Sequence, residues 1–419
     1  MSTQDFRLTY HACRAALVKR LAEPAPGRIQ LLAGPRQVGK TTLLLEIAAQ
    51  AGRQAVYAAA DAPEAALPGF WERLLARAED TAVAHGRAVL LLDEAHLLHG
   101  WAGHLKGAWD SFRRRKTPIH IVATGSSALH LAAGSRESLA GRFERLTLTH
   151  WSARSVAQAF HLQPDKAADL VVRMGSYPGA FALYKDVARW SAYVRDAILE
   201  PAIGRDILAL AVVRRPALLR QVFGVAASSP AQIVSLQKIQ GQLQDAGAIE
   251  TVASYLTLLE EAFLVAALPK YSTRAARRRA APPKLVTLNN ALIAVMVPQD
   301  IADGTFDPAR FGALVENACL AHAWNSGQVV SYWREEPLEV DGILEGSWGK
   351  WAIEVKTGKF QTSDLTGLLE FARRHPGFQP LVICSANGRT TAERADVPAV
   401  TWQQFLLDGP PGTTARSLR

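Results

Sequence analysis

The segment GPRQVGKT, residues 34–41, restricts the fold of this chain more than any other stretch of its sequence. It has the spacing of a phosphate-binding loop, G-x-x-x-x-G-K-[ST], and it lies between an apolar strand pattern at 28–34 and a helical pattern at 40–50. Glycines allow backbone N–H groups to point at a phosphate chain, and the start of the helix adds a favourable dipole. An ordinary glycine-rich turn is the alternative. The residues expected to bind ATP are Gly34, Pro35, Arg36, Gln37, Val38, Gly39, Lys40, Thr41 and Thr42.

Side chains in this loop and in AVLLLDEAH predict how ATP would be held and attacked. We expect Lys40 to bridge the β- and γ-phosphates and the Thr41 hydroxyl to bind Mg²⁺. Asp93 ends an aliphatic strand pattern, where its carboxylate can also hold Mg²⁺, and Glu94 can polarise the attacking water. Asp93 could instead cap the next helix, but that interpretation leaves Glu94 unexplained. The expected cofactors are therefore ATP and Mg²⁺.

Polar residues also follow the next strand pattern along the chain. Thr124, in VATGSS, could contact the γ-phosphate or orient the water. Arg142, in LAGRFERL, either reaches the γ-phosphate of a neighbouring subunit or is a surface salt-bridge partner. The first alternative for Arg142 predicts a homo-oligomer.

Strand and helix patterns alternate over residues 1–150. Apolar segments at 28–34, 55–61 and 119–127 are separated by helical stretches, and a further strand pattern is FERLTLTHW. The run AVLLL, which precedes Asp93, is continuously aliphatic, which is typical of a parallel sheet covered on both faces. Together these patterns predict a doubly wound α/β domain with a parallel sheet.

The motifs GPRQVGKTTLL, LLLDEAHLL, ATGSSALHL and SLAGRFERLTL follow one another in that order. The chain thereby resembles the bacterial and archaeal AAA+-type P-loop ATPases that carry an uncharacterised C-terminal domain. The resemblance extends through MGSYPGAF, YVRDAILEPAIGRDIL and AIEVKTG, and so covers nearly the whole chain. It implies an AAA+-like domain at 1–150 and a helical lid or connector at 151–205, in which Pro178 would pack near the nucleotide.

The segment 206–298 has the order helix, turn, helix and two short strands, which is typical of a winged helix. The basic stretch RAARRRAAPP lies between the strands and could follow the phosphate backbone of DNA without reading bases. The candidate recognition helix, ETVASYLTLLEEA, carries acidic residues, which disfavours sequence-specific readout. Winged helices also pack against proteins, which is the alternative. The residues expected to contact DNA are Arg274, Arg277, Arg278 and Arg279.

The segment WAIEVKTG, residues 351–358, reads as an apolar strand with two charges on one face, because Glu354 and Lys356 are two positions apart. Burying these charges costs free energy unless something compensates them. With Asp341 on an earlier strand and Glu316 on the preceding helix, the order is E…D…E-x-K. This order resembles the restriction-endonuclease-like PD-(D/E)xK superfamily. The resemblance implies Mg²⁺ or Mn²⁺ on Asp341, Glu354 and Glu316, with Glu354 and Lys356 acting in phosphodiester cleavage.

Two alternatives remain for this C-terminal α/β domain, expected at 299–410. The strand could be a solvated edge strand, or the domain could have kept binding and lost its chemistry. The remaining residues, 411–419, are expected to form a disordered tail.

Composition favours a polyanionic partner, because the chain carries a net charge of +9 and has a pI near 9.6. Its three cysteines lie far apart, no apolar signal core is visible at the N-terminus, and no run approaches the roughly 18 to 20 apolar residues of a membrane span. We therefore expect a cytoplasmic protein without a membrane partner. The expected function is ATP-driven processing of DNA in repair, recombination or defence. The alternative is a regulatory ATPase switch whose C-terminal domain only binds a partner.

Overall fold

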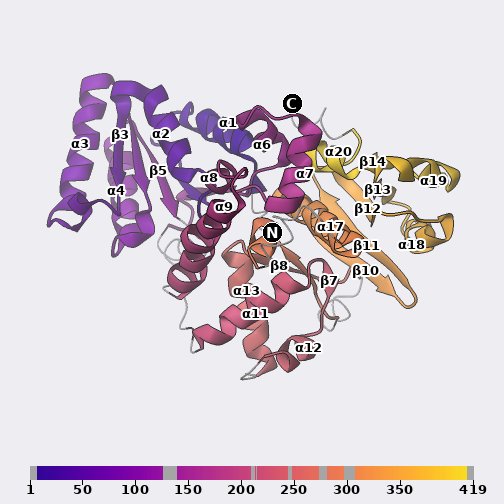
Figure 1. Cartoon of the computed structure of the whole chain (residues 1–419). Coiled ribbons are helices and arrows are strands. Elements are labelled where there is room, and N and C mark those ends of the chain that lie inside the picture. Colours follow the sequence, from indigo (N-terminus) through magenta and orange to yellow (C-terminus); the bar gives the residue numbers. More distant parts are fainter. Residues whose placement is uncertain are drawn as a thin grey trace. The chain divides into compact units, whose positions relative to one another are not determined.

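The computed structural model describes residues 7–125, 139–208, 213, 215–243, 248–272, 281–296 and 307–412 (Figure 1). The chain divides into two compact units, Met1–Thr149 and His150–Arg419. Each unit is described by itself below.

The first unit is built on a six-stranded sheet in the order β1-β6-β2-β5-β4-β3, and all of its strand pairs are parallel. Every residue of β2, β4 and β5 is buried, as the continuous aliphatic pattern predicts for strands covered on both faces. The elements are β1 (Arg7–Leu8), α1 (Tyr10–Leu21), β2 (Ile29–Ala33), α2 (Lys40–Ala51), η1 (Gly52–Gln54), β3 (Ala55–Ala59), η2 (Pro63–Ala66), α3 (Phe70–His85), β4 (Ala88–Asp93), η3 (Ala95–Leu97), α4 (Trp101–Arg115), β5 (Ile119–Gly125) and β6 (Phe143–Leu148).

Helices cover both faces of this sheet. Apolar residues of α3 and α4 form one core with alternate residues of β2, β4 and β5. On the other side, α2 packs on β3 and β4, and α1 packs on β6 (Figure 1). The predicted doubly wound domain is confirmed, and the expected strands correspond to β2, β3, β4, β5 and β6.

The second unit begins with helices, as its sequence pattern predicts. Their main core joins α7, α9 and α11 to α13 and to the strands that follow. The helical elements are α6 (Ala153–Ala159), α7 (Pro164–Met174), α8 (Pro178–Phe181), α9 (Val187–Tyr193), its π-helical continuations η4 (Val194–Leu199) and η5 (Ala202–Ile207), and α11 (Pro216–Ser228).

A small antiparallel sheet of order β7-β9-β8 follows α11. It contains β7 (Gln232–Ile233), β8 (Val265–Leu268) and β9 (Lys284–Thr287), and the helices α12 (Leu236–Gly241) and α13 (Ile249–Glu261) lie between β7 and β8 in sequence. The two expected helices and two expected strands of this region are therefore present. The stretch between β8 and β9 that holds Arg274, Arg277, Arg278 and Arg279 lies outside the described residues. A short helix, α15 (Ala291–Ala294), follows β9.

The C-terminal part contains a five-stranded mixed sheet in the order β10-β11-β12-β13-β14. Strands β10, β11 and β12 are antiparallel neighbours, whereas β12, β13 and β14 run parallel. The predicted second α/β unit is thus confirmed. Its elements are α17 (Pro308–Asn325), β10 (Val329–Glu335), β11 (Leu338–Gly346), β12 (Gly349–Lys356), η6 (Thr362–Leu365), α18 (Thr366–Arg374), β13 (Gln379–Cys384), η7 (Ala386–Gly388), α19 (Arg389–Arg394), β14 (Ala399–Thr401) and α20 (Trp402–Asp408).

None of the helices within the described ranges is long and apolar enough to cross a membrane. The expected tail from 413 onwards lies outside those ranges.

Candidate functional site

The loop between β2 and α2 has the backbone that its glycines predict. A Cβ added at Gly34 would lie 2.1 Å from the carbonyl oxygen of Leu148, so no larger residue fits there. Gly39 has φ +97° and is the N-cap of α2, so the helix starts immediately after it. The loop therefore places backbone N–H groups at a helix N-terminus, which is a binding site for phosphate.

Lys40 is the first residue of α2, and its side chain folds back into the loop. Its ammonium donates to the carbonyl oxygens of Pro35 at 2.8 Å and Gly34 at 3.0 Å. The side chain is buried, and Thr41, the next residue, is exposed at the same end of the helix. The lysine ammonium and the threonine hydroxyl thus come from adjacent residues at the N-terminal end of α2.

Asp93, Glu94 and Thr124 form a hydrogen-bonded group where β4 and β5 end. The Thr124 hydroxyl donates to Asp93 Oδ1, and the Glu94 N–H donates to Thr124 Oγ1 at 2.9 Å and to Asp93 Oδ1 at 3.1 Å. Tyr57 of β3 donates its hydroxyl to the other carboxylate oxygen of Asp93 at 3.3 Å. Burial and then the Asp93 charge raise the pKa of Tyr57 to about 12, so the tyrosine stays a donor. Both carboxylate oxygens of Asp93 thus accept hydrogen bonds from neighbouring strands.

Glu94 has an unusual backbone. Its φ of +48° is left-handed, a conformation that costs free energy for a residue with a side chain. The side chain is one quarter exposed and lies 3.3 Å from Nδ1 of His96. Left-handed backbone in a non-glycine residue clusters at functional sites, which agrees with the role that the sequence predicts for Glu94.

The sheet brings these predicted residues to one edge. The phosphate-binding loop follows β2, Asp93 ends β4 and Thr124 is the next-to-last residue of β5, which lies between the other two strands. Because the strands are parallel, their carboxyl ends meet at the same edge of the sheet, where ligands of open α/β sheets bind. The donor set fits Mg²⁺, which prefers hydroxyl and carboxylate oxygens and would take Thr41 and Asp93.

Arg142 lies at the opposite edge of the sheet. Its carbonyl accepts a 2.8 Å hydrogen bond from the N–H of Ile29, where β2 begins, and the five residues of β2 span roughly 17 Å before the loop starts. The guanidinium makes two bonds to Asp110, at 2.8 and 3.2 Å, and lies over the ring of Trp109. These bonds to Arg142 are the largest influence on the pKa of Asp110, which is lowered. Arg142 is therefore turned away from the loop of its own chain.

A surface groove of about 590 Å³ surrounds this ion pair. It is lined by Asp110, Arg113, Arg114 and Arg142. Arg113 lies over the Trp109 ring, 5.1 Å from its centroid, so two guanidiniums flank one indole. The groove is basic and faces away from the nucleotide edge.

The second candidate site is a cluster of charges in the C-terminal part. Glu354 and Lys356 of β12 point to the same side as expected, and Lys356 Nζ donates to Glu354 Oε1 at 2.7 Å. Asp341 of β11 lies one position beyond the registered pair Gly342–Ile353, beside Glu354, and its Oδ2 accepts from the N–H of Val355 at 2.8 Å. The sheet thus assembles the predicted D…E-x-K group.

Lys284, which the sequence reading did not single out, enters this cluster from β9. Its Nζ lies 2.5 Å from Glu316 Oε1, 3.3 Å from Asp341 Oδ1 and 3.8 Å from Glu339 Oε1, and its side chain is 2% exposed. It also donates to the backbone carbonyl of Asp341 at 3.2 Å. The only sequence signal was a lysine at the head of KLVTLN, an apolar strand pattern like that of WAIEVKTG.

The charges of the cluster do not fully balance. Glu339 also pairs with Arg334, and without it the three carboxylates of Glu316, Asp341 and Glu354 face two ammonium groups, so one negative charge is left over when all are ionised. Burial and the Asp341 charge raise the pKa of both Glu316 and Glu354 to about 8, against the opposing effect of the lysines. The pKa of Lys284 is raised despite its burial, because the carboxylates outweigh the loss of water. The cluster therefore holds a proton more tightly than free carboxylates would.

The arrangement does not fit a divalent metal as it stands. Lys284 occupies the point where Glu316 and Asp341 converge, and the other oxygen of Asp341 is bonded to the backbone. Oε2 of Glu354 is buried and has no hydrogen-bond partner among the described residues, but one oxygen does not make a metal site. In the part of the chain that the structure describes, no group of three or more His, Cys, Asp or Glu could hold a metal ion. The metal at Glu316, Asp341 and Glu354 stays a prediction.

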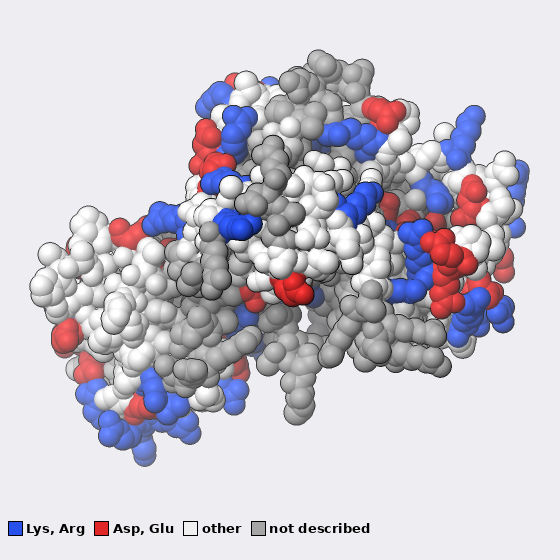
Figure 2. Space-filling view, turned by 90° about the horizontal axis from the view of Figure 1, so that it is seen from below, with Lys and Arg blue, Asp and Glu red and all other residues white. Residues whose placement is uncertain are grey.

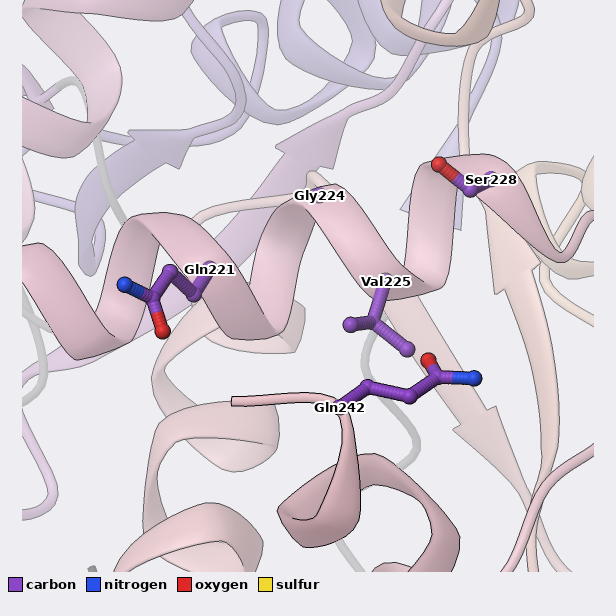
Figure 3. Close-up of a pocket in the computed structure, with 5 residues that line it drawn as sticks. All are labelled: Gln221, Gly224, Val225, Ser228 and Gln242. Atoms are coloured by element: carbon purple, nitrogen blue, oxygen red, sulfur yellow. The ribbon is translucent and has the colours of Figure 1, made fainter. Parts of the chain in front are cut away.

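A second cavity, of about 390 Å³, lies beside α11. Gln221, Gly224, Val225 and Ser228 of that helix line it together with Gln242, and Figure 3 shows their side chains around it. The lining carries amides and a hydroxyl but no formal charge. It lacks the features of a phosphate or metal site.

The remaining predicted residues are placed as follows. Pro178 begins α8 in the second unit, and its packing near the nucleotide stays a prediction. On the face in Figure 2, basic side chains gather at the lower left, and basic and acidic side chains lie side by side at the right. Many arginines there and elsewhere are paired with carboxylates, for example Arg115 with Glu79 and Arg220 with Glu200. The net positive charge therefore does not by itself locate a partner.

Comparisons with known protein families match three segments of the chain. The family model of the AAA domain (AAA_14) matches residues 26–157. Models of two domains of unknown function, DUF8612 and DUF4143, match residues 166–302 and 311–405. A search of the curated proteins found no match. The first unit, with its parallel sheet and phosphate-binding loop, thus has the fold of a P-loop AAA+ ATPase, as the sequence predicts.

Several solved structures are similar to the chain. The Orc1 protein of Aeropyrum pernix in complex with DNA has 15% identity, with 70% of this chain and 92% of that chain covered and a TM-score of 0.30. AMPPCP-bound DnaA from Aquifex aeolicus has 15% identity, with 60% and 87% covered and a TM-score of 0.33. A variant of RuvB from Thermotoga maritima has 20% identity, with 63% and 91% covered and a TM-score of 0.35.

Proposed function

We propose that this protein is a Mg²⁺-dependent ATPase that acts on DNA. The observation that carries the proposal is the meeting of the loop at 34–41 with Asp93, Glu94 and Thr124 at one edge of a parallel sheet. Loop N–H groups and Lys40 hold the phosphates, and Lys40 exchanges its carbonyl contacts for phosphate oxygens. Thr41 and Asp93 would hold Mg²⁺, which neutralises charge on the β- and γ-phosphates. Glu94 then polarises the attacking water.

Thr124 is a positioning residue in this scheme. Its hydroxyl ties the Asp93 carboxylate to the Glu94 backbone, so the metal ligand and the residue that polarises water are held as one unit. The left-handed backbone of Glu94 directs its side chain from the end of β4.

Arg142 completes the site only from a neighbouring subunit, within a homo-oligomer. This assignment is supported by its place at the edge of the sheet away from its own loop. The Asp110 carboxylate keeps the guanidinium ordered until a more highly charged γ-phosphate competes for it.

Contact with DNA is assigned to the winged-helix-like region. Its support is the order α11, β7, α12, α13, β8, β9, with the sheet β7-β9-β8, and the presence of Arg274, Arg277, Arg278 and Arg279 in the sequence between β8 and β9. The outward positions of α13 are Glu250, Ser254 and Thr257, which offer no positive charge. Binding would therefore follow the phosphate backbone and depend little on sequence.

The C-terminal domain is assigned a restriction-endonuclease-like fold, supported by Asp341 and Glu354 on neighbouring strands with Lys356 on the same face. The second candidate function is an ATPase switch in which this domain only binds a partner. The specific observation that favours it is Lys284, which lies among the carboxylates that would otherwise hold a metal. We place the protein in the cytoplasm, where its buried, free Cys13, Cys319 and Cys384 would stay reduced.

ATP hydrolysis measured with and without duplex, single-stranded, forked and four-way DNA tests the proposal. A DNA-acting ATPase is stimulated by at least one of these, whereas a partner-bound switch is not. Glu94→Gln keeps the Mg²⁺ ligand and removes the group that polarises water, so it should bind ATP and hydrolyse it very slowly. Turnover by Glu94→Gln at the wild-type rate would overturn the site assignment.

A further inference from the structure

Strand β9, which carries Lys284, is joined to helix α17 by buried amides. Asn317 accepts from the Thr287 N–H at 2.9 Å and donates to the Thr287 carbonyl at 2.8 Å, as a neighbouring strand would. Asn290 donates to the carbonyl of Leu314, and Asn325 donates to that of Leu288. Buried amides that lose these partners pay a desolvation penalty, so the strand cannot leave the helix cheaply.

The two ends of the connection between β8 and β9 are also attached to the C-terminal sheet. Lys270 forms a parallel bridge with Tyr332 of β10, and the Tyr271 N–H donates to the Tyr332 carbonyl at 2.6 Å. The Tyr332 hydroxyl donates to the carbonyl of Pro282 at 2.5 Å, just before β9 begins. The segment that carries Lys284 is thus bonded to α17 through Asn317 and to β10 through Tyr332.

The position of Lys284 has a direct electrostatic meaning. An ammonium that is 2% exposed has lost its water and must be stabilised by charges around it. Glu316 and Asp341, its two nearest partners, come from α17 and β11, and Glu339 lies further along β11. The lysine thus lies where carboxylates from two elements converge, which is where a cation would bind.

We propose that Lys284 is the resident cation of this carboxylate cluster and takes the place of a divalent metal. The cluster is then a metal-free ionic joint that fastens the three-stranded sheet to the C-terminal domain. This inference goes beyond the proposed ATPase and does not depend on it. It also answers why charged residues are tolerated on the apolar strand β12, because their neighbour Asp341 is neutralised from another domain.

The test counts metal sites and measures thermal stability in the full-length chain. All proteins carry Lys40→Ala and are studied without nucleotide, so that the first unit contributes as little metal binding as possible. Calorimetric titration with Mn²⁺ and melting curves in EDTA and in Mn²⁺ are recorded for this background and for added Lys284→Met. Lys350→Met is the matched control. Lys350 pairs with Glu345 within the C-terminal sheet, but the Lys350 side chain is 55% exposed.

In the background protein we expect no Mn²⁺ site that depends on Asp341. Lys284→Met should lower the melting temperature of the second unit in EDTA by roughly 5–10 °C, and Lys350→Met should leave that temperature nearly unchanged. The Lys284→Met protein should gain one saturable Mn²⁺ site that restores stability, and Asp341→Asn should remove that site. Lys284→Met/Glu316→Gln, which removes one charge of each sign, should fold and melt closer to the background protein in EDTA.

Three outcomes would overturn the inference. The first is a Mn²⁺ site in the background protein that Asp341→Asn abolishes, since metal and Lys284 would then coexist. The second is a Lys284→Met protein that loses no more stability than Lys350→Met and gains no metal. The third is failure of the charge-balanced double variant to fold, because the role of Lys284 would then be packing and not charge.

Discussion

Replacing Thr124 by valine removes one hydroxyl from a fully buried position and keeps the shape of the side chain nearly unchanged. The hydroxyl donates to Asp93, and a hydrogen bond to a charged group contributes about 1.5–3 kcal/mol. The Glu94 N–H also loses Thr124 Oγ1 as an acceptor, but it keeps its second acceptor, Asp93 Oδ1 at 3.1 Å. The loss of the first acceptor therefore adds little to the free-energy cost of the substitution. If the full amount is lost from the transition state, kcat falls by roughly 10- to 100-fold, at about 1.4 kcal/mol per factor of ten.

The assay is steady-state ATP hydrolysis at saturating Mg²⁺ and ATP, together with equilibrium binding of a fluorescent ATP analogue. Thr124→Val should lower kcat and leave nucleotide affinity within a few-fold, because the loop at 34–41 is untouched. Thr124→Ser is the control, since it keeps the hydroxyl and should retain most of the activity. Equal kcat values for the valine and serine variants would refute the positioning role, as would a loss confined to nucleotide affinity.

The other predictions concern the subunit interface, the basic segment and pH. Mixing Arg142→Ala with Lys40→Ala protein should recover ATPase activity that neither has alone, because some interfaces pair an intact arginine with an intact loop; no recovery speaks against action between subunits. Neutralising the arginines at 277–279 should reduce the slope of log affinity for duplex DNA against log salt by roughly 2 to 3 units, and an unchanged slope places the contact elsewhere. Because Glu316 and Glu354 have their pKa raised from 4.5 to about 8, the folded protein binds protons that the unfolded chain releases between these values. The free energy of unfolding of the second unit should therefore fall as pH rises from about 5 to 8. Glu354→Gln should make the melting temperature in EDTA depend less on pH.

The nucleotide edge could be predicted from the sequence because its determinants are local. The loop needs glycines at two positions, and the strand before Asp93 is an unbroken aliphatic run. Each pattern extends over fewer than about ten residues. Once the strands pair in parallel, their carboxyl ends meet at the same edge of the sheet. The bond between Thr124 and Asp93 is a consequence of β4 and β5 being neighbours. The neighbouring strand positions of Asp341 and Glu354 follow in the same way from the pairing of β11 and β12.

The partners of Arg142 and Lys284 could not be predicted, because they are set by packing between distant segments. Arg142 meets Asp110 across 32 residues, and either could have met any of the many charges on the surface. Lys284 meets Asp341 across 57 residues, and the contact exists only because β9 packs on α17 through Asn317. A lysine at the head of an apolar strand signals that a counter-charge must exist, but not where it comes from.

Charge pairing connects β9, which carries the buried Lys284, with β12, whose charged face looked unsuited to burial in the sequence. KLVTLN carries a positive charge into an apolar environment, and WAIEVKTG lies beside a carboxylate, Asp341, that needs one. Each segment alone would lose free energy on burial, and together they lose less, because each removes the other's uncompensated charge. Burial and the charge of Asp341 hold a proton on the cluster near neutral pH against the effect of the lysines, and Lys284 occupies the point where a metal would bind. If Lys284 is the resident cation, its charge holds the three-stranded sheet and the C-terminal sheet of the second unit together.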